Sequence, residues 1–256
     1  AETSGINTID YFVSSALYEL PYDEAQTHYS EQLLLHQSLG TYYYDHYYAM
    51  YDAACADGFA LPEALHDPTT PVVFYPHALD KASDHDLRVC AAVLTATAAD
   101  AHPPALVFVD AKQDAHHKAR LAKALAGFAD RVYVFPRLPT GHFYQVLRRA
   151  TLVLDAYPHG GFHTSLEAMY FGKVVVTRPS AYLRGRFTQG FYKRLGMVGP
   201  IAADEAALVD RTVGLVRDAE QRGKLEAHVG RHGGRLFNEV ASVREWEDTL
   251  VGVGLV

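Results

Sequence analysis

Short apolar runs alternate with longer mixed segments from about residue 72 to the end of the chain. Runs of this kind predict buried strands, and they occur at 72–75, 106–109, 132–135, 152–154 and 174–176. The mixed segments predict helices at 86–101, 115–128, 142–149, 164–171, 184–195 and 205–219. Strands that alternate with helices are typical of a parallel sheet covered on both faces. With right-handed crossovers, the pattern predicts an α/β fold with a doubly wound, Rossmann-like parallel sheet.

The first part of the chain does not follow this alternation. Residues 9–13 could form a strand, whereas residues 28–40 match no period. The tyrosine-rich segment 42–51 could stack on sugars or bases. The simpler interpretation is a flank that packs on the main domain with its hydroxyls at the surface. A stretch with three prolines at 62–71 indicates a linker or loop.

The C-terminal tail, residues 224–250, predicts one or two helices. It contains the single tryptophan, Trp246, which we interpret as a packing anchor.

The segment 155–167 joins a predicted strand to a predicted helix, and it carries two glycines followed by two hydroxyls. Gly160 and Gly161 let the backbone approach a ligand closely. The free N–H groups at a helix start also suit a phosphate. The alternative needs no ligand, because Thr164 and Glu167 have the spacing of a capping box that satisfies backbone donors.

Topology predicts a partner for this turn. In a doubly wound sheet of order 3-2-1-4-5-6, ligands bind at the carboxyl ends of the strands where the order reverses. The first strand is followed by Lys81 and the fourth by the glycine turn, so Lys81 should lie near Thr164 and Ser165. A lysine beside a helix N-terminus can hold a diphosphate. Taken alone, Lys81 could be a solvated surface residue, but the glycine turn favours the ligand interpretation.

Two further stretches, residues 136–143 and 84–86, are expected near the same edge of the sheet. Each has two possible interpretations. Arg137 follows the third strand and could meet a phosphate or a base, and Phe143 could pack on a base. Alternatively, Thr140 caps a helix and Phe143 belongs to the core. The motif at 84–86 has the D-x-D form of some metal–nucleotide sites, but capping is favoured at a helix start. Neither G-x-G-x-x-G nor G-x-x-x-x-G-K-[ST] occurs, which argues against an ordinary dinucleotide or P-loop protein.

The composition of the chain argues against several classes of binding partner. The net charge of −7 and the pI near 6.0 argue against a nucleic-acid surface. No run reaches the ~18 apolar residues of a membrane helix, and the start lacks signal-peptide features, so we expect no membrane contact and a cytoplasmic location. Cys55 and Cys90 are too few for a disulfide scaffold. The 14 histidines are scattered without ligand spacing, so no metal site is expected.

Several segments, in this order and spacing, resemble a known family. The segments are 9–12, 28–33, 136–137, 152–161, 164–168, 172–177, 191–196 and 244–247. Together they resemble the C-terminal lobe of GT-B glycosyltransferases, in the group of the O-linked N-acetylglucosamine transferase, the plant SPINDLY O-fucosyltransferase and the bacterial adhesin N-glucosyltransferases. The resemblance covers nearly the whole chain. It implies that residues 1–68 are the remnant or end of an N-terminal lobe plus a linker, and that residues 69–256 bind a nucleotide sugar.

The resemblance also implies how the donor is held, without a metal or any further cofactor. Lys81 is the implied catalytic residue, because it would contact the diphosphate. The other implied donor contacts are Arg137 and Phe143 near the base, His163, Thr164 and Ser165 around the phosphates, and Glu167 at the ribose hydroxyls. A UDP-sugar is favoured and a GDP-sugar is the alternative. One departure concerns positions 77–78, where family members often carry a glutamine near the donor.

The implied function is nucleotide-sugar-dependent glycosyl transfer of the protein O- or N-glycosylation type. Its partners would be a nucleotide sugar and either a protein acceptor or a subunit that supplies the other lobe. The family's N-terminal lobe, which supplies acceptor contacts and a catalytic histidine, is expected to be largely missing. His159 and His163 lie on the leaving-group side and are disfavoured as bases. The alternatives are a non-catalytic assembly or nucleotide-sensing module, and another doubly wound enzyme such as an epimerase.

Overall fold

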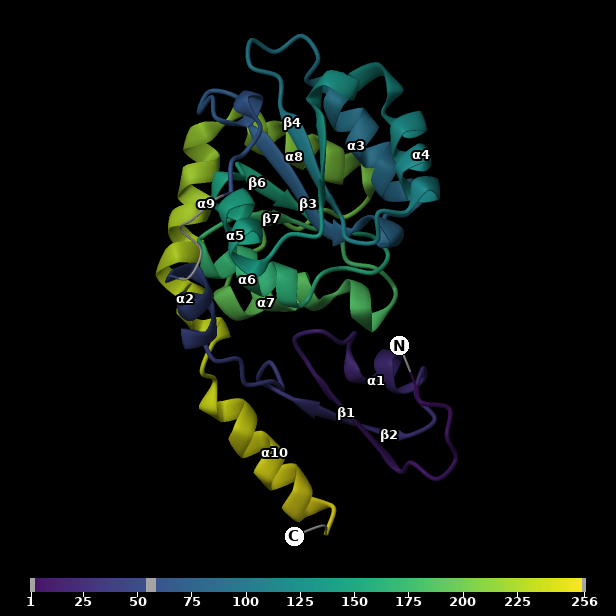
Figure 1. The fold of residues 1–256 in the computed structure, drawn as a ribbon. Helices are drawn as coiled ribbons and strands as arrows, with labels where there is room; N and C mark the ends of the chain where they lie inside the picture. The colour runs from purple at the N-terminus through teal and green to yellow at the C-terminus, as the bar shows by residue number, and fades with distance from the viewer. Residues whose placement is uncertain (1–2, 54–58, 255–256) are drawn as a thin grey trace.

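The computed structural model describes residues 3–53 and 59–254. Its main sheet, at the centre of Figure 1, consists of β3 (Val72–Ala78), β4 (Ala105–Asp110), β5 (Val132–Pro136), β6 (Leu152–Leu154) and β7 (Val175–Val176). The spatial order is β5-β4-β3-β6-β7, and all neighbouring pairs are parallel. Numbered from β3, this is the order 3-2-1-4-5 of a doubly wound sheet. The predicted fold class and its five predicted strands are confirmed.

The alternation of side chains along the strands builds one core on each face of the sheet. On β3, Val72 and Phe74 belong to one core, and Val73 and Tyr75 belong to the other. Because both faces are covered, the strands consist almost entirely of apolar residues. The first face is covered by α5 (Thr140–Arg149), α6 (His163–Tyr170), α7 (Phe187–Leu195) and α9 (Ala219–His232). The second face is covered by α3 (Asp84–Ala96), α4 (Ala115–Ala124) and α8 (Glu205–Arg217).

Helix α3 begins two residues earlier than predicted, because its start is fixed by a capping box. Ser83 accepts a hydrogen bond from the Asp86 N–H, and the Asp86 carboxylate accepts one from the Ser83 N–H. Asp84 instead pairs with Arg120 at 2.7 Å. The D-x-D motif therefore serves capping and surface pairing, as the favoured interpretation predicted.

The two capping alternatives at the site are wrong. Helix α5 has Pro139 at its N-cap and α6 has Phe162, and neither helix start has a side-chain capping hydrogen bond. Thr140 and Thr164 are already inside the first turn of their helices. Across the described ranges, no helix combines the length and apolar character needed to cross a bilayer.

The N-terminal part forms a small unit that lies beneath the main sheet in Figure 1, on the side toward which β3 points. Its parallel strands are β1 (Tyr11–Ser15) and β2 (Gln32–His36), with α1 (Tyr22–Gln26) between them. The strand predicted at 9–13 is confirmed with a shift of two residues. Strand β2 was not predicted, because in it only Leu33 and His36 are buried and the apolar pattern has no clear period.

The last helix, α10 (Val240–Gly252), packs beside this N-terminal unit. Glu245 accepts hydrogen bonds from the N–H groups of Gln37 at 2.9 Å and Ser38 at 3.1 Å. Trp246 donates through Nε1 to the Gly40 carbonyl at 3.0 Å. The predicted anchoring role of Trp246 is confirmed, although 40% of the residue remains exposed.

A buried ion pair also joins the N-terminal unit to the main domain. Arg186, just before α7, donates to Glu19 Oε2 at 2.9 Å and to the Tyr18 carbonyl at 2.6 Å. The two charged side chains are only 3% and 0% exposed. Tyr29 donates to the second oxygen of Glu19 at 2.6 Å. These bonds fix the small unit against the main domain.

The tyrosine-rich segment leads into α2 (His46–Ala53). Tyr42 and Tyr44 are exposed, as expected of a flanking segment. Tyr48 differs, because it is buried to 1% exposure with its hydroxyl inside, and its ring lies 5.0 Å from that of Tyr170. The expectation that the hydroxyls face solvent is therefore wrong for Tyr48. Cys55 lies outside the described residues.

Candidate functional site

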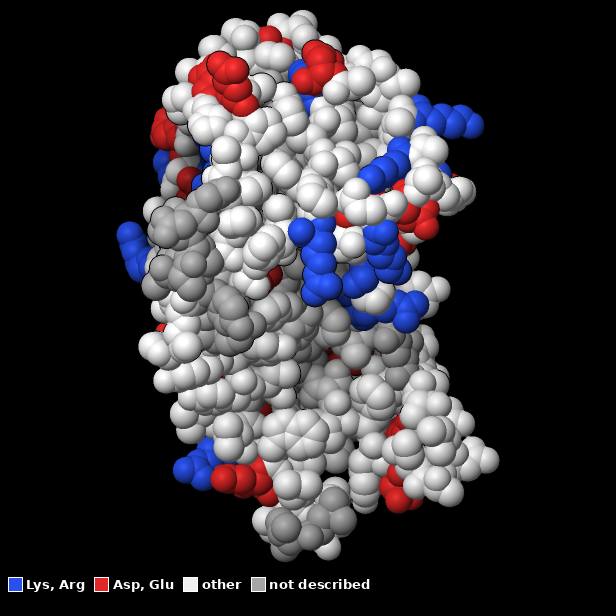
Figure 2. All heavy atoms as spheres, viewed as in Figure 1, with Lys and Arg blue, Asp and Glu red and all other residues white. Residues whose placement is uncertain are grey.

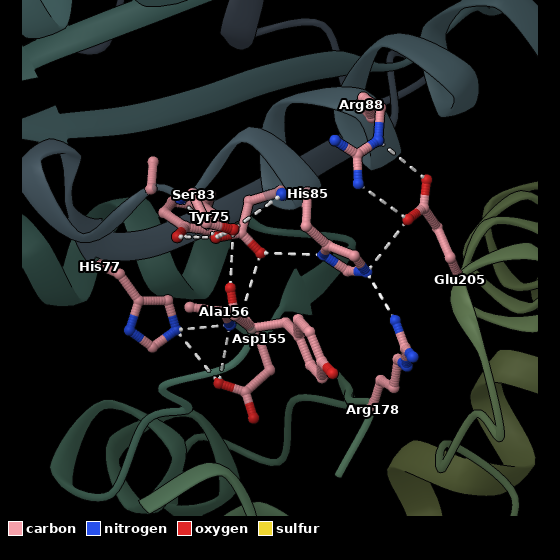
Figure 3. Close-up of polar contacts among 12 residues, drawn as sticks. Tyr75, His77, Ser83, His85, Arg88, Asp155, Ala156, Arg178 and Glu205 are labelled. Carbon is pink, nitrogen blue, oxygen red and sulfur yellow. Dashed lines mark hydrogen bonds and ion pairs between the residues drawn. The ribbon is translucent and has the colours of Figure 1, made fainter. Parts of the chain in front are cut away.

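The predicted site is where the strand order reverses. Strands β3 and β6 pair in parallel, so their carboxyl ends open at the same edge. Ser83, just beyond the end of β3, donates through Oγ to the Tyr157 carbonyl at 2.7 Å, and Asp86 accepts from the Tyr157 N–H at 2.9 Å. Figure 3 shows this meeting of the two loops. The loop after the first strand therefore meets the glycine turn, and the approach of Lys81 to Thr164 and Ser165 stays a prediction.

Asp155, directly after β6, organises the glycine turn. Its Oδ1 accepts hydrogen bonds from the N–H groups of Ala156 at 2.9 Å and Gly161 at 2.7 Å, and Oδ2 accepts from Thr177 Oγ1 at 2.8 Å. Burial alone would raise the pKa of this carboxyl group. Hydrogen bonds from His77 and from the Gly161 N–H outweigh burial and hold the Asp155 pKa below its ordinary value. The turn is therefore built around a buried carboxylate.

Gly161 lies where no larger residue fits without rearrangement. A Cβ atom at this position would approach Thr164 Oγ1 to 2.4 Å, and His77 Cε1 and Ser165 Oγ to 2.9 Å each. The glycine therefore lets the end of β3 and the start of α6 come together.

Substituting Gly161 with alanine should destabilise the protein by about 1–3 kcal/mol, because overpacking forces neighbouring side chains from their positions. Urea unfolding measures this loss. Gly214→Ala in α8 is the matched control: no atom lies within 4 Å of its added Cβ, so stability should be unchanged or slightly higher. Equal stability of Gly161→Ala and the wild type would contradict the packing described here.

The start of α6 lies at this edge of the sheet and carries backbone N–H groups that have no partner within the helix. The first intrahelical bond at this end runs from the Leu166 N–H to the Phe162 carbonyl, so the preceding helical N–H groups have no acceptor within the helix. The two hydroxyls of the turn have different roles. Ser165 is buried and its Oγ lies 2.7 Å from Thr188 Oγ1, and it also donates to the Gly161 carbonyl. Thr164 is half-buried beside Gly161, and its contact with a phosphate stays a prediction.

Glu167 and His163 lie one helical turn apart on α6. Glu167 is 7% exposed, and its Oε1 accepts a hydrogen bond from the Tyr144 hydroxyl at 3.3 Å. Burial raises the pKa of Glu167 to about 7, and the Tyr144 bond offsets this only in part. His163 Nδ1 lies 3.6 Å from the same oxygen, and burial lowers the His163 pKa. A carboxyl group with this pKa changes charge near neutral pH.

The remaining predicted site residues follow other strands. Lys81 ends the short 3-10 helix η2 (Leu79–Lys81) and is exposed, as is Arg137 after β5. Phe143 is half-buried, with its ring 5.4 Å from that of Phe74. This contact agrees with the interpretation of Phe143 as part of the core, and its contact with a base stays a prediction.

Basic residues gather at this edge of the sheet. A lysine or arginine follows four of the five strands within three residues: Lys81, Lys112, Arg137 and Arg178. Figure 2 shows lysine and arginine side chains grouped on this face of the molecule. In the same view, β3 ends at this height in Figure 1. Because parallel strands end at one edge, these four residues start from the same edge of the sheet, where Lys112 pairs with Asp80 and Arg178 with His85.

An apolar groove adjoins the turn. It has a volume of about 470 Å³ and lies between the N-terminal unit and the main domain. Its aromatic lining consists of Phe12, Tyr18, Tyr43, Phe162, Phe187 and Trp246. Phe162 is the N-cap residue of α6, so the groove opens beside the helix start.

Sequence reasoning did not assign Asp155 or His77 to the site as polar partners. Asp155 Oδ1 lies 3.2 Å from His77 Nε2, and both residues are buried. The available signal was an aspartate directly after a buried strand at the predicted switch point. A third residue without an assignment, Arg178, lies over the Tyr157 ring and donates to His85 Nε2 at 2.9 Å (Figure 3).

Comparison of the sequence with known protein families finds no match, and comparison with curated proteins finds none. Solved structures do match this fold. An O-GlcNAc transferase mutant from Thermobaculum terrenum is 22% identical with a TM-score of 0.77, covering 96% of this chain and 45% of that one. A UDP-forming α,α-trehalose-phosphate synthase from Burkholderia xenovorans is 13% identical with a TM-score of 0.61, covering 85% of this chain and 52% of that one.

The chain therefore spans about half the length of the solved structures it matches. Both matched proteins are glycosyltransferases of the GT-B fold. The chain has the fold of a GT-B glycosyltransferase lobe.

Proposed function

We propose that this chain is the donor-binding lobe of a nucleotide-sugar-dependent glycosyltransferase, with a UDP-sugar favoured over a GDP-sugar. The observation that carries the proposal is the glycine turn and helix start at the switch point of a GT-B lobe, with Lys81 on the adjoining loop. The name of one matched protein describes a UDP-forming enzyme, which supports the choice of UDP.

In this arrangement the diphosphate lies on the N-terminus of α6, where backbone N–H groups and the Thr164 hydroxyl meet it. Lys81 stabilises the negative charge that grows on the leaving diphosphate. Glu167 accepts hydrogen bonds from the ribose hydroxyls. Arg137 lies toward the base. The sugar extends toward the apolar groove beside Phe162. The aromatic rings that line this groove can pack against the face of a sugar or an acceptor.

Titration calorimetry with UDP and GDP tests the proposal directly. We expect UDP to bind the folded chain and GDP to bind less tightly. The absence of heat with both nucleotides at millimolar concentration, on protein shown to be folded, would overturn the proposed function.

We expect donor binding without a divalent metal, because Lys81 and the α6 N-terminus supply the positive charge. Within the described residues, no group of three or more His, Cys, Asp or Glu side chains is placed to hold a metal ion. UDP titrations in EDTA and then in excess Mg²⁺ or Mn²⁺ should give similar affinities. A hundredfold gain with metal would contradict this expectation.

The free energy of unfolding should fall as pH rises from about 4.5 to about 7, owing to Glu167. Its folded-state pKa is raised to about 7, so the folded protein binds more protons than the unfolded chain in this window and loses that advantage as pH rises. The shift corresponds to a contribution on the order of 3 kcal/mol. Urea unfolding of the wild type and Glu167→Gln between pH 4.5 and 8 isolates this contribution. Parallel pH profiles for the two proteins would show that Glu167 is not responsible.

We expect the 256-residue chain alone to bind the donor without transferring the sugar. Transfer needs a bound donor, a placed acceptor and a route for the acceptor proton, and the residues described supply a set only for the first. The assay incubates the purified chain with radiolabelled UDP-sugars and mixed peptide acceptors. Acceptor-dependent turnover that Lys81→Ala abolishes would contradict this expectation. Nucleotide binding by a full-length protein that never transfers would favour a nucleotide-sensing module instead.

A further inference from the structure

We propose that His77 binds the donor diphosphate through its Nδ1 atom, and that Asp155 is the residue that positions it. This inference rests on the proposed function, because it requires a nucleotide in the crevice. His77 lies near the end of β3 (Val72–Ala78), and Asp155 directly follows β6. The pair therefore spans the switch point itself, on the two strands whose ends form the crevice.

The orientation of the imidazole follows from the hydrogen bonds around Nε2. This atom lies 3.2 Å from Asp155 Oδ1 and also 3.2 Å from the Ala156 nitrogen. The Ala156 N–H has a closer acceptor in Asp155 Oδ1, at 2.9 Å. A buried carboxylate is stabilised by donors, so we assign the proton to Nε2, which donates it to Asp155. This assignment leaves Nδ1 as the ring nitrogen that can serve a ligand.

The surroundings of Nδ1 place it beside the phosphate turn. Figure 3 shows Nδ1 on the side of the ring turned away from Asp155, and no hydrogen bond joins it to a described residue. A Cβ added at Gly161 would lie 2.9 Å from Cε1, the ring carbon between Nδ1 and Nε2, and 2.4 Å from Thr164 Oγ1, so this end of the His77 ring lies beside the start of α6. A phosphate on the start of α6 therefore lies within reach of this edge of the ring.

The charges around the ring allow it to become a cation when an anion binds. Protonation of Nδ1 gives an imidazolium whose charge is balanced by the buried Asp155 carboxylate. Tyr75 of β3 also faces the ring, with its own ring 5.1 Å away, and its hydroxyl donates to Asp86 of α3 at 3.1 Å. Lys81 follows on the next loop. A diphosphate adds negative charge at Nδ1, so binding should draw a proton from solution.

The test compares UDP with uridine, and the wild type with His77→Gln. Calorimetry at pH 7.5 in HEPES and in Tris, whose ionisation enthalpies differ, measures protons taken up on binding. The wild type should take up a proton with UDP and none with uridine. His77→Gln should lose this uptake and bind UDP about tenfold more weakly, as expected for a charge-assisted bond, while its uridine affinity stays unchanged. Unchanged UDP affinity and unchanged proton uptake in His77→Gln would overturn the proposal.

A measurement on the wild type keeps the test independent of variant folding. In protein with ¹⁵N-labelled histidine, UDP should shift the Nδ1 resonance of His77 toward the protonated position, and uridine should not. A Nδ1 resonance that UDP leaves unchanged would overturn the proposal. Asp155→Asn tests the positioning role: the UDP-induced shift and the proton uptake should be lost, and their persistence in the folded variant would refute that role. A wild type that binds neither UDP nor GDP would instead overturn the proposed function, and this inference with it.

Discussion

Replacing Lys81 with alanine is expected to weaken UDP binding about tenfold or more without changing the fold. The side chain is exposed at the end of η2, so its loss leaves no cavity. A charge-assisted hydrogen bond to a diphosphate contributes about 1.5–3 kcal/mol, which corresponds to a factor of ten or more in affinity. Titration calorimetry of the wild type and Lys81→Ala with UDP measures the difference.

Lys112 provides the matched control for this experiment. It is also an exposed lysine after a strand of the same sheet, but it pairs with Asp80. Lys112→Ala removes the same formal charge from the same edge, so it reports the general electrostatic effect of one lysine. We expect it to weaken UDP binding much less than Lys81→Ala. Equal losses in the two variants would mean that Lys81 acts only through the overall field and makes no contact.

Substituting Arg186 with methionine is expected to destabilise the protein by about 3–5 kcal/mol, because it leaves Glu19 buried without its ionic partner. Arg186 also donates to the carbonyls of Tyr18 at 2.6 Å and Ala181 at 2.8 Å, and both would lose that donor. Since typical domains are stable by about 5–15 kcal/mol, the loss should be evident as a lower urea midpoint. Intrinsic fluorescence and circular dichroism should both report it.

An exposed ion pair provides the contrast. Arg244 and Glu247 of α10 lie 2.6 Å apart but are 70% and 54% exposed, so solvent screens their attraction. Arg244→Met should leave the urea midpoint within experimental error of the wild type. If Arg186→Met were as stable as Arg244→Met, the buried pair would not be what holds the N-terminal unit against the main domain.

The sequence predicted the sheet because its strands are buried on both faces. The apolar runs from Val72 to Val176 have few polar interruptions, and that pattern requires helices on either side. Right-handed crossovers then leave few possible strand orders, and one of them brings the loop after β3 to the glycine turn. The meeting of these two loops could therefore be predicted without any knowledge of side-chain contacts.

Prediction from the sequence failed in two places. In one the hydrophobic pattern was weak, and in the other the spacing of two residues fitted two different roles. Strand β2 buries only Leu33 and His36, so neither a strand nor a helix period was visible. The spacing of Thr164 and Glu167 fits a capping box, but the helix begins one residue before Thr164. Glu167 then turns inward to Tyr144 instead of back to the helix start.

By itself, the sequence determined the α/β class, the strands of the main sheet and the edge at which the loops after β3 and β6 meet, because burial and turn chemistry are local properties. Only the tertiary structure decided which polar groups meet at that edge. His77 and Asp155 come from separate strands that are far apart in the chain, and their side chains meet at 3.2 Å. The hydroxyl of Ser165 likewise meets that of Thr188, which belongs to another helix. Such pairings depend on strand order, register and side-chain direction together, and no local pattern of residues specifies all three.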